Sequence, residues 1–444
     1  MKTPICDFVK HYAESGTRRF HMPGHKGVSS LGLEHLDITE VVGADSLYDA
    51  DGIIGESERN ASEIFDCPIF YSTEGSSQCI RAMLYLVILA AKEKGKTPLV
   101  LAGRNAHKTF LSAAALLGFD VEWLFPTEGD SYLSCTVDAD ALEKRLTADE
   151  KKPTAVYLTS PDYLGSVADI RAIADVCHRH GVLLCVDNAH GAYLKFLSPS
   201  RHPIDLGADV CCDSAHKTLP VLTGGAYLHL AKAFPATRTQ VKAALSLFGS
   251  TSPSYLILQS LDAQNPYLHK GFSADVAAFL PHVEELSQHL TAHGYSLVSD
   301  EPLKITIRTK SYGYTGTDLA ELLRQNGIEC EFADPDFLVF MLSPAIGVDA
   351  LRELEQLLTS LPRRNEIKDT PPQPARPQVA MTIRDAMLSP CEILPVRDSV
   401  GRILAAATVS CPPAIPIVVS GEIIDESALA CFDYYGIDTC NVIK

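Results

Sequence analysis

Lys217 and Asp187 are the two residues of this chain whose types and spacing could do chemistry together. A lysine amine can form a Schiff base with an aldehyde cofactor. Enzymes that use pyridoxal 5'-phosphate (PLP) also place a carboxylate beside the pyridine nitrogen, which keeps the ring protonated as an electron sink. A His-Lys pair after a strand is, by itself, an ordinary surface feature. The neighbouring residues must therefore show whether Lys217 is a surface lysine or a Schiff-base lysine.

Both residues lie where a predicted strand ends. Residues 182–187 are typical of a buried parallel strand that ends in the Asp187 carboxylate. Residues 209–213 are typical of the next strand, and Ser214, His216 and Lys217 follow it directly. Open α/β sheets bind ligands at the carboxyl ends of their strands. We therefore expect the amine and the carboxylate at the same sheet edge.

A candidate phosphate site precedes the predicted helix at residues 76–94. Gly75, Ser76 and Ser77 combine small side chains, hydroxyl groups and backbone N–H groups at a helix N-terminus. Such a terminus binds phosphate through its N–H groups and its dipole. The alternative interpretation is an ordinary serine N-cap, which is the more frequent meaning of two serines before a helix.

Two further strand ends carry polar groups. His107 follows the predicted strand at residues 98–102, and residues 159–165 follow the predicted strand at 155–159. A histidine at this edge could stack on a pyridine ring, whereas a lone histidine is more often hydrogen-bonded within the structure. The four strand ends together predict one crevice lined with polar or ring-stacking groups.

Alternating helices and short apolar strands after residue 50 predict an α/β fold with a mostly parallel sheet covered on both faces. The expected helices include those at residues 108–117 and 231–248. A long helix at residues 272–293 then leads into a small α+β domain, and a proline-rich stretch around residues 371–374 indicates a linker. We expect five regions, namely an N-terminal arm (1–50), a large cofactor-binding domain (51–270), a small α+β domain (271–362), a linker (363–378) and a C-terminal α+β domain (379–444).

Bulk properties exclude several classes of protein. The formal net charge of -17 argues against a nucleic-acid-binding surface. The first residues have no apolar core long enough for a signal peptide, and no apolar run reaches the length of a membrane span. The 13 cysteines lack metal-ligand spacing, so we expect reduced thiols in a cytoplasmic protein and no metal.

The order of the motifs resembles the Orn/Lys/Arg decarboxylase family, whose members are PLP enzymes of the aspartate-aminotransferase fold (fold type I). The matching segments are residues 20–27, 37–45, 105–109, 159–161, 186–191, 214–218, 251–255, 412–416 and 420–422. The resemblance covers nearly the whole chain. It is similar to the short form of the family, which lacks the additional N-terminal regulatory domain.

The resemblance implies a role for each matching residue. Lys217 would be the Schiff-base lysine and Asp187 the partner of the pyridine nitrogen, and Lys217 or His216 would return a proton to Cα. The expected cofactor-binding set is Gly75, Ser76, Ser77, His107, Asp187, Ala189, His190, Ser214, His216 and Lys217, completed by Thr251 and Ser252 from a second subunit. The resemblance thus implies a homodimer with a shared active site.

The implied activity is PLP-dependent decarboxylation of arginine, lysine or ornithine to an amine and CO2. Glu422 matches a family carboxylate that meets the distal cation of the substrate, and Asp45 is a second acidic candidate. For both residues the alternative is a solvated acidic side chain. Other open readings are an aminotransferase, a carbon–sulfur lyase, or a non-catalytic homologue that regulates an active enzyme.

Several positions depart from the family pattern and leave the choice of basic amino acid open. They are Glu74, Asn188, Cys411, Ala414 and Ser420. The sequence also leaves open whether His21 and His25 reach the site or only order the N-terminal arm.

Overall fold

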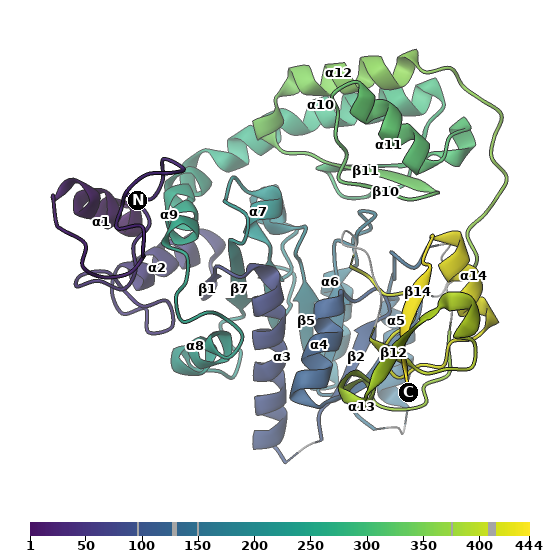
Figure 1. Cartoon of the computed structure of the whole chain (residues 1–444), viewed down its shortest axis with the longest axis horizontal. Helices are drawn as coiled ribbons and strands as arrows, with labels where there is room; N and C mark the ends of the chain where they lie inside the picture. Colours follow the sequence, from purple (N-terminus) through teal and green to yellow (C-terminus); the bar gives the residue numbers. More distant parts are fainter. Residues whose placement is uncertain (96, 127–130, 149–150, 374–375, 407–413) are drawn as a thin grey trace. The chain divides into compact units, whose positions relative to one another are not determined.

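The computed structural model describes residues 1–444 except 96, 127–130, 149–150, 374–375 and 407–413. The chain has the predicted α/β fold, with a large and mostly parallel central sheet (Figure 1). Two compact units share the chain, one built from Met1–Lys96 and Leu183–Val276, the other from Thr97–Val182 and Ala277–Lys444. Within the described ranges, no helix is both long and apolar enough to cross a membrane.

The first unit contributes four strands in the order β1 (Ile69–Ser72), β7 (Ala226–Leu230), β6 (Val210–Asp213) and β5 (Leu183–Asp187). β5 and β6 run parallel, with Asp187 opposite Cys212. β7 runs antiparallel to both of its neighbours. These strands are almost entirely buried, as expected for a sheet covered on both faces.

The second unit contributes β2 (Leu99–Gly103), β3 (Asp120–Leu124) and β4 (Ala155–Thr159), with β2 parallel to both of the others. The same unit holds two smaller antiparallel sheets. One has the order β10 (Phe332–Ala333), β11 (Phe337–Met341), β9 (Lys304–Arg308), β8 (Ser296–Leu297). The other has the order β12 (Cys391–Pro395), β14 (Thr439–Ile443), β13 (Leu404–Ala406).

Most predicted helices agree with the structure to within a few residues. The helices of the first unit are α1 (Pro4–Glu14), α2 (Ile53–Phe65), α3 (Gly75–Glu93), α7 (Ala215–Thr218), α8 (Arg238–Ser246) and α9 (Tyr255–Lys270). Those of the second are α4 (Lys108–Leu117), α5 (Ala139–Thr147), α6 (Ile170–Arg179), α11 (Gly316–Gln325), α12 (Val348–Ser360), α13 (Ile383–Leu388) and α14 (Glu426–Tyr434), while α10 (Phe272–His293) begins in the first unit and ends in the second.

One predicted helix was too long. A helix was expected over residues 231–248, but α8 begins only at Arg238. Pro235 lies in the missing part, where it offers no N–H group and holds Phe234 away from the helical conformation. Thr237 then starts the helix with a capping box, because its side chain accepts from the Gln240 N–H while the Gln240 side chain accepts from the Thr237 N–H.

The N-terminal arm contains a helix, α1, that the sequence did not predict. Its N-cap, Thr3, makes no side-chain capping bond. The fully buried Asp262 of α9 supplies the cap instead, with its carboxylate accepting from the N–H groups of Ile5 (2.9 Å) and Cys6 (3.0 Å). The same carboxylate accepts from the Ser57 hydroxyl of α2 at 2.6 Å. One buried acidic group therefore ties three helices together.

Replacing Asp262 with alanine should lower the free energy of unfolding by about 2–4 kcal/mol, because two buried donors and one half-buried donor lose their acceptor. Urea denaturation of the purified protein measures the change. The control is Asp7→Ala, since Asp7 is an exposed acidic residue in the first turn of α1. It should cost no more than about 0.5 kcal/mol. Equal losses in the two variants would contradict the anchoring role of Asp262.

Candidate active site

Lys217 lies on the short helix α7, directly after β6. Its Nζ donates to Nε2 of His190 at 3.0 Å. An ammonium group only donates hydrogen bonds, so this contact leaves Nε2 of His190 as the acceptor and places the ring proton on Nδ1. His190 is buried whereas Lys217 is exposed, so the amine bonds to a buried ring and can be approached from solvent.

Asp187 ends β5 and is buried. Its Oδ1 accepts from the backbone N–H of Ala189 at 3.2 Å and from the thiol of Cys212 at 3.7 Å. Because β5 and β6 pair in parallel register, Cys212 lies directly opposite Asp187. Both contacts hold the carboxylate at the strand end. There it can accept a further hydrogen bond from a protonated nitrogen.

The N-terminus of α3 lies next to the end of β6. Glu74, its N-cap, makes no side-chain capping bond, and Gly75 has a positive φ of 69° with no atom near the position of a Cβ. Ser214, at the end of β6, donates its hydroxyl to Ser76 Oγ at 2.8 Å. The 19-residue helix thus presents its first turn, with two linked hydroxyl groups, beside the strand that leads to Lys217.

His216 is the neighbour of Lys217 on α7. Its Nδ1 lies 3.0 Å from the carbonyl oxygen of Gly225, which only accepts, so Nδ1 carries the proton. Burial lowers the pKa of His216. The ring is therefore neutral at physiological pH, and its Nε2 is an acceptor.

His107 belongs to the second unit, at the N-cap of α4. Its Nδ1 accepts from the backbone N–H of Thr109 at 3.1 Å, which leaves Nε2 as the protonated nitrogen. The N–H group of Lys108, which lies between His107 and Thr109, donates to the carbonyl oxygen of Ala414 at 2.8 Å. Ala414 has a φ of 58°, a left-handed conformation that suits glycine better than alanine.

Glu422, also in the second unit, forms a buried ion pair with Arg104 rather than facing solvent. Arg104 Nη2 lies 2.9 Å from Glu422 Oε2, and the same oxygen accepts from the Val419 N–H at 2.8 Å. The guanidinium lies over the rings of Trp123 and Phe125. Burial raises the pKa of Glu422, and the Arg104 charge opposes that shift. Sequence reasoning missed Arg104, although its position just after a predicted strand was a signal.

Asp45 is buried as well, and its carboxylate caps α2. Oδ2 accepts from the N–H groups of Gly52, Ile54 and Gly55, and Oδ1 accepts from Ser46 N–H. This arrangement accounts for the burial of the group without a ligand. By contrast, Thr251 and Ser252 are exposed in the loop between α8 and α9.

The remaining open positions also have places in the structure. His21 bonds to the Tyr12 hydroxyl at 2.6 Å and His25 lies 3.2 Å from Asp37, so both histidines order the N-terminal arm. Asn188 donates to Asp213 Oδ1 at 2.6 Å. Cys411 and the two prolines after it lie outside the described residues.

The first-unit residues that were expected to bind PLP meet the requirements of that cofactor. An amine, a buried carboxylate and an anion-binding helix terminus all lie at the carboxyl ends of β5 and β6 or beside them. These are the groups needed by an aldehyde, a pyridine nitrogen and a phosphate, respectively. The side chains present therefore fit PLP.

Comparison with known proteins agrees with this chemistry. Residues 3–289 match the family "Orn/Lys/Arg decarboxylase, major domain", and residues 365–438 match "Orn/Lys/Arg decarboxylase, C-terminal domain". The chain is 29% identical to an uncharacterized protein, YaaO, of Bacillus subtilis, over 97% of this chain and 93% of that protein. It is also 29% identical to an arginine decarboxylase of Halalkalibacterium halodurans, over 97% of this chain and 92% of the relative.

Solved structures show the same fold. The lysine decarboxylase LdcF of Francisella novicida superposes with a TM-score of 0.82 at 17% identity, covering 100% of this chain and 81% of the other. Lysine decarboxylase A of Pseudomonas aeruginosa gives a TM-score of 0.79 at 17% identity, covering 99% and 80%. From the family match and the site, the chain belongs to the Orn/Lys/Arg decarboxylase family and is a PLP-dependent amino-acid decarboxylase.

Proposed function

We propose that this decarboxylase acts on a basic amino acid, with arginine as the main substrate. The observation that carries the proposal is the match, along almost the whole chain, to relatives named arginine decarboxylase, from Halalkalibacterium halodurans and from Bacillus subtilis. Lysine and ornithine are the competing substrates. The products are the corresponding amine and CO2.

Bound PLP supplies an electron sink for the pair released at Cα when CO2 leaves. Lys217 would hold the cofactor through its amine. Asp187 would keep a proton on the ring nitrogen by its negative charge. Gly75, Ser76, Ser77 and Ser214 would bind the phosphate. Ala189 and His190 would contact the ring, and His107 would stack on it.

Proton return to Cα is assigned to the pair of basic groups on α7. Lys217, as an ammonium, carries a transferable proton, and its hydrogen bond to His190 Nε2 orients the amine. Neutral His216 has an unprotonated Nε2, because its Nδ1–H is directed at the Gly225 carbonyl. His216 therefore serves as a proton acceptor beside Lys217, and Lys217 as the donor.

At the substrate end, Glu422 is the better supported of the two acidic candidates. Its Oε1 is buried and has no hydrogen-bond partner among the described residues, while Oε2 binds Arg104 and Val419. A buried acceptor without a partner is costly, and the distal cation of a basic amino acid would satisfy it. Asp45, in contrast, uses its oxygens to cap α2.

A homodimer would complete the site. Thr251 and Ser252 are exposed and available to a second copy of the chain. The N-terminal arm exposes large apolar side chains, among them Phe20 (92%), Leu31 (86%) and Val42 (102%). Apolar side chains exposed in this way are typical of a surface that another subunit covers.

The free thiols of the described cysteines agree with a reducing, cytoplasmic location.

The purified holoenzyme should release CO2 and an equal amount of amine from arginine, with lower kcat/KM for lysine and ornithine. Parallel assays of CO2, amine and keto acid with these three substrates and two neutral amino acids test this. A keto acid as the main product would refute decarboxylation of the free amino acid. Efficient turnover of neutral amino acids only would refute the substrate class while leaving the enzyme class intact.

Replacing Asp187 with alanine should reduce kcat by roughly 100-fold or more while the protein stays folded, because the charge that keeps the ring nitrogen protonated is lost. Steady-state kinetics with saturating PLP, together with circular dichroism, measure both effects. Asp209→Asn is a matched control at the opposite end of β6, where its carboxylate accepts from Leu184 N–H. Robust turnover in Asp187→Ala would exclude the assigned role.

Glu422→Gln should raise KM for arginine by about 10- to 100-fold, equal to about 1.4–2.8 kcal/mol, with PLP affinity unchanged. The neutral amide can no longer attract the substrate cation. In the parent enzyme kcat/KM should also fall on acidification, from a higher pH than an ordinary glutamate would give, because burial raises the pKa of Glu422 and its protonation removes the charge. That fall should be weaker in Glu422→Gln.

Arg104→Gln separates a substrate role of Glu422 from a structural one. This variant removes the cation of the pair and leaves the Glu422 carboxylate in place. If Glu422 binds substrate, the two variants should shift KM in opposite directions or by very different factors. Equal losses of thermal stability with the same KM in both would mean that the pair is only structural.

A further inference from the structure

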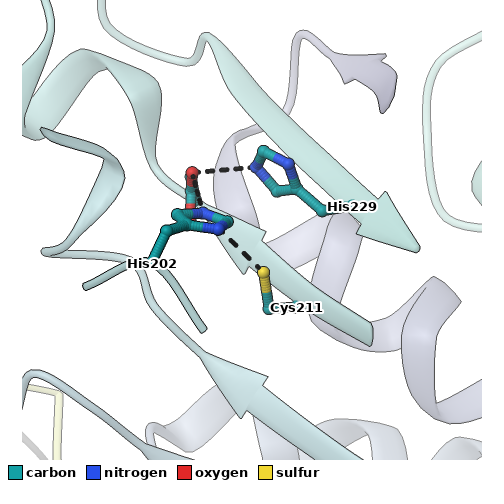
Figure 2. Close-up of side chains that lie close together, drawn as sticks. His202, Cys211 and His229 are labelled. Atoms are coloured by element: carbon teal, nitrogen blue, oxygen red, sulfur yellow. Dashed lines mark hydrogen bonds and ion pairs between the residues drawn. The ribbon is translucent and has the colours of Figure 1, made fainter. Parts of the chain in front are cut away.

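A second group of reactive side chains lies in the first unit, apart from those assigned to PLP and substrate. It consists of His202, Cys211, Asp213 and His229, and we call it the His–Cys–Asp cluster. One donor atom from each residue lies within 4.8 Å of the donor atoms of all the others. Figure 2 shows the side chains of His202, Cys211 and His229 pointing toward one another.

Strand pairing brings these residues together. Cys211 and Asp213 are two positions apart on β6, so both side chains point to the same face of the sheet. His229 on β7 is the direct antiparallel partner of Cys211, which places its side chain on that face as well. His202 reaches the cluster from the loop after the turn at Ala192–Phe196. The spacing of these residues in the sequence gives no indication of the cluster.

The cluster is completely buried. The four side chains are at most 1% exposed. His202 Nε2 and His229 Nε2 lie 3.2 Å and 2.8 Å from the same oxygen, Oδ2 of Asp213, and Cys211 Sγ lies 4.0 Å from His202 Nε2. Two imidazoles, a carboxylate and a thiol in one buried site are a costly arrangement for a fold that needs only packing there.

We propose that the His–Cys–Asp cluster is a binding site for one divalent cation of the zinc class. Two imidazole nitrogens, one thiolate and one carboxylate oxygen form a four-ligand set of borderline softness, which suits Zn2+ and its spectroscopic substitute Co2+. Mg2+ and Ca2+ prefer all-oxygen sites and do not suit this set. A dication would neutralise the carboxylate and the thiolate, leaving no net charge buried.

The distances support four-coordinate binding. Tetrahedral zinc with bonds of about 2.0–2.3 Å places neighbouring donor atoms roughly 3.3–3.8 Å apart. The observed separations of 2.8, 3.2 and 4.0 Å lie on both sides of that range, so shifts of about an ångström would accommodate the ion. On binding, the thiol proton leaves to solvent and each imidazole carries its proton on Nδ1.

Outer contacts for such a site are present. Asn188 donates to the second carboxylate oxygen, Oδ1 of Asp213, at 2.6 Å. The Nδ1 of His229 lies 3.7 Å from Cys67 Sγ. When Nε2 binds the metal, the ring proton is on Nδ1, and the Cys67 sulfur can accept a hydrogen bond from it. The ring of Phe65 contacts both histidines, with centroid distances of 5.7 and 5.0 Å. These contacts hold the orientation of Asp213 and the two histidines on the side away from the proposed ion.

The ion would have a structural role beyond the proposed decarboxylation, since all four positions are filled by protein. It would join β6, β7 and the loop that carries His202, and β6 leads directly to Ser214 and Lys217. The proposal does not depend on which amino acid is decarboxylated.

The test is metal analysis of the untagged holoenzyme, produced in defined medium with added Zn2+ and dialysed against metal-free buffer. We expect close to one zinc per chain in the parent and in Cys440→Ser, a control at a buried cysteine of β14 far from these ligands in the sequence. Cys211→Ser and His229→Gln should retain less than about 0.1 zinc per chain. Protein produced with Co2+ should show tetrahedral d–d absorption and a thiolate charge-transfer band that Cys211→Ser lacks.

Parent protein that carries less than about 0.1 equivalent of zinc and of cobalt would overturn the proposal. So would bound metal that is unchanged in both ligand variants. If the variants are insoluble, X-ray absorption of the zinc in the parent decides instead. A shell of one sulfur and three nitrogen or oxygen atoms supports the site, and any other shell contradicts it.

Discussion

The parallel pairing of β5 and β6 is the constraint on which the active site depends. It sets Asp187 opposite Cys212, so the carboxylate of one strand and the residues that follow the other reach the same edge. The N-terminus of α3 joins this edge through the Ser214–Ser76 hydrogen bond. A slip of the register by one residue would turn every side chain of β6 to the opposite face and separate the amine from its acid.

β6 serves two different sites because its side chains alternate. Cys212 and Ser214 face the candidate active site, where they contact Asp187 and Ser76. Cys211 and Asp213 face the other side, where they meet two histidines. Asn188 connects the two sides, since it follows Asp187 in the sequence and donates to Asp213. Its amide is suited to this contact, whereas a glutamate at position 188 would bring a second negative charge against a buried carboxylate.

Periodicity was enough to predict much of the fold and to place Asp187, Ser214 and Lys217 at the ends of β5 and β6. The helices Lys108–Leu117 and Phe272–His293 and the strand Ala155–Thr159 were located with their observed bounds. Contacts between distant segments were not predictable. α1 was missed because its cap, Asp262, lies more than 250 residues away. Likewise, the ion pair of Glu422 with Arg104 and the His–Cys–Asp cluster arise from tertiary neighbours that carry no signature in local spacing.

The proposed mechanism requires that Lys217 carries the cofactor. Borohydride reduction of the holoenzyme, followed by proteolysis and mass spectrometry of the peptides, identifies the modified lysine. We expect a phosphopyridoxyl group on the peptide that contains Lys217 and on no other lysine. Attachment at a different lysine, or a folded and active enzyme with no modified lysine, would contradict it.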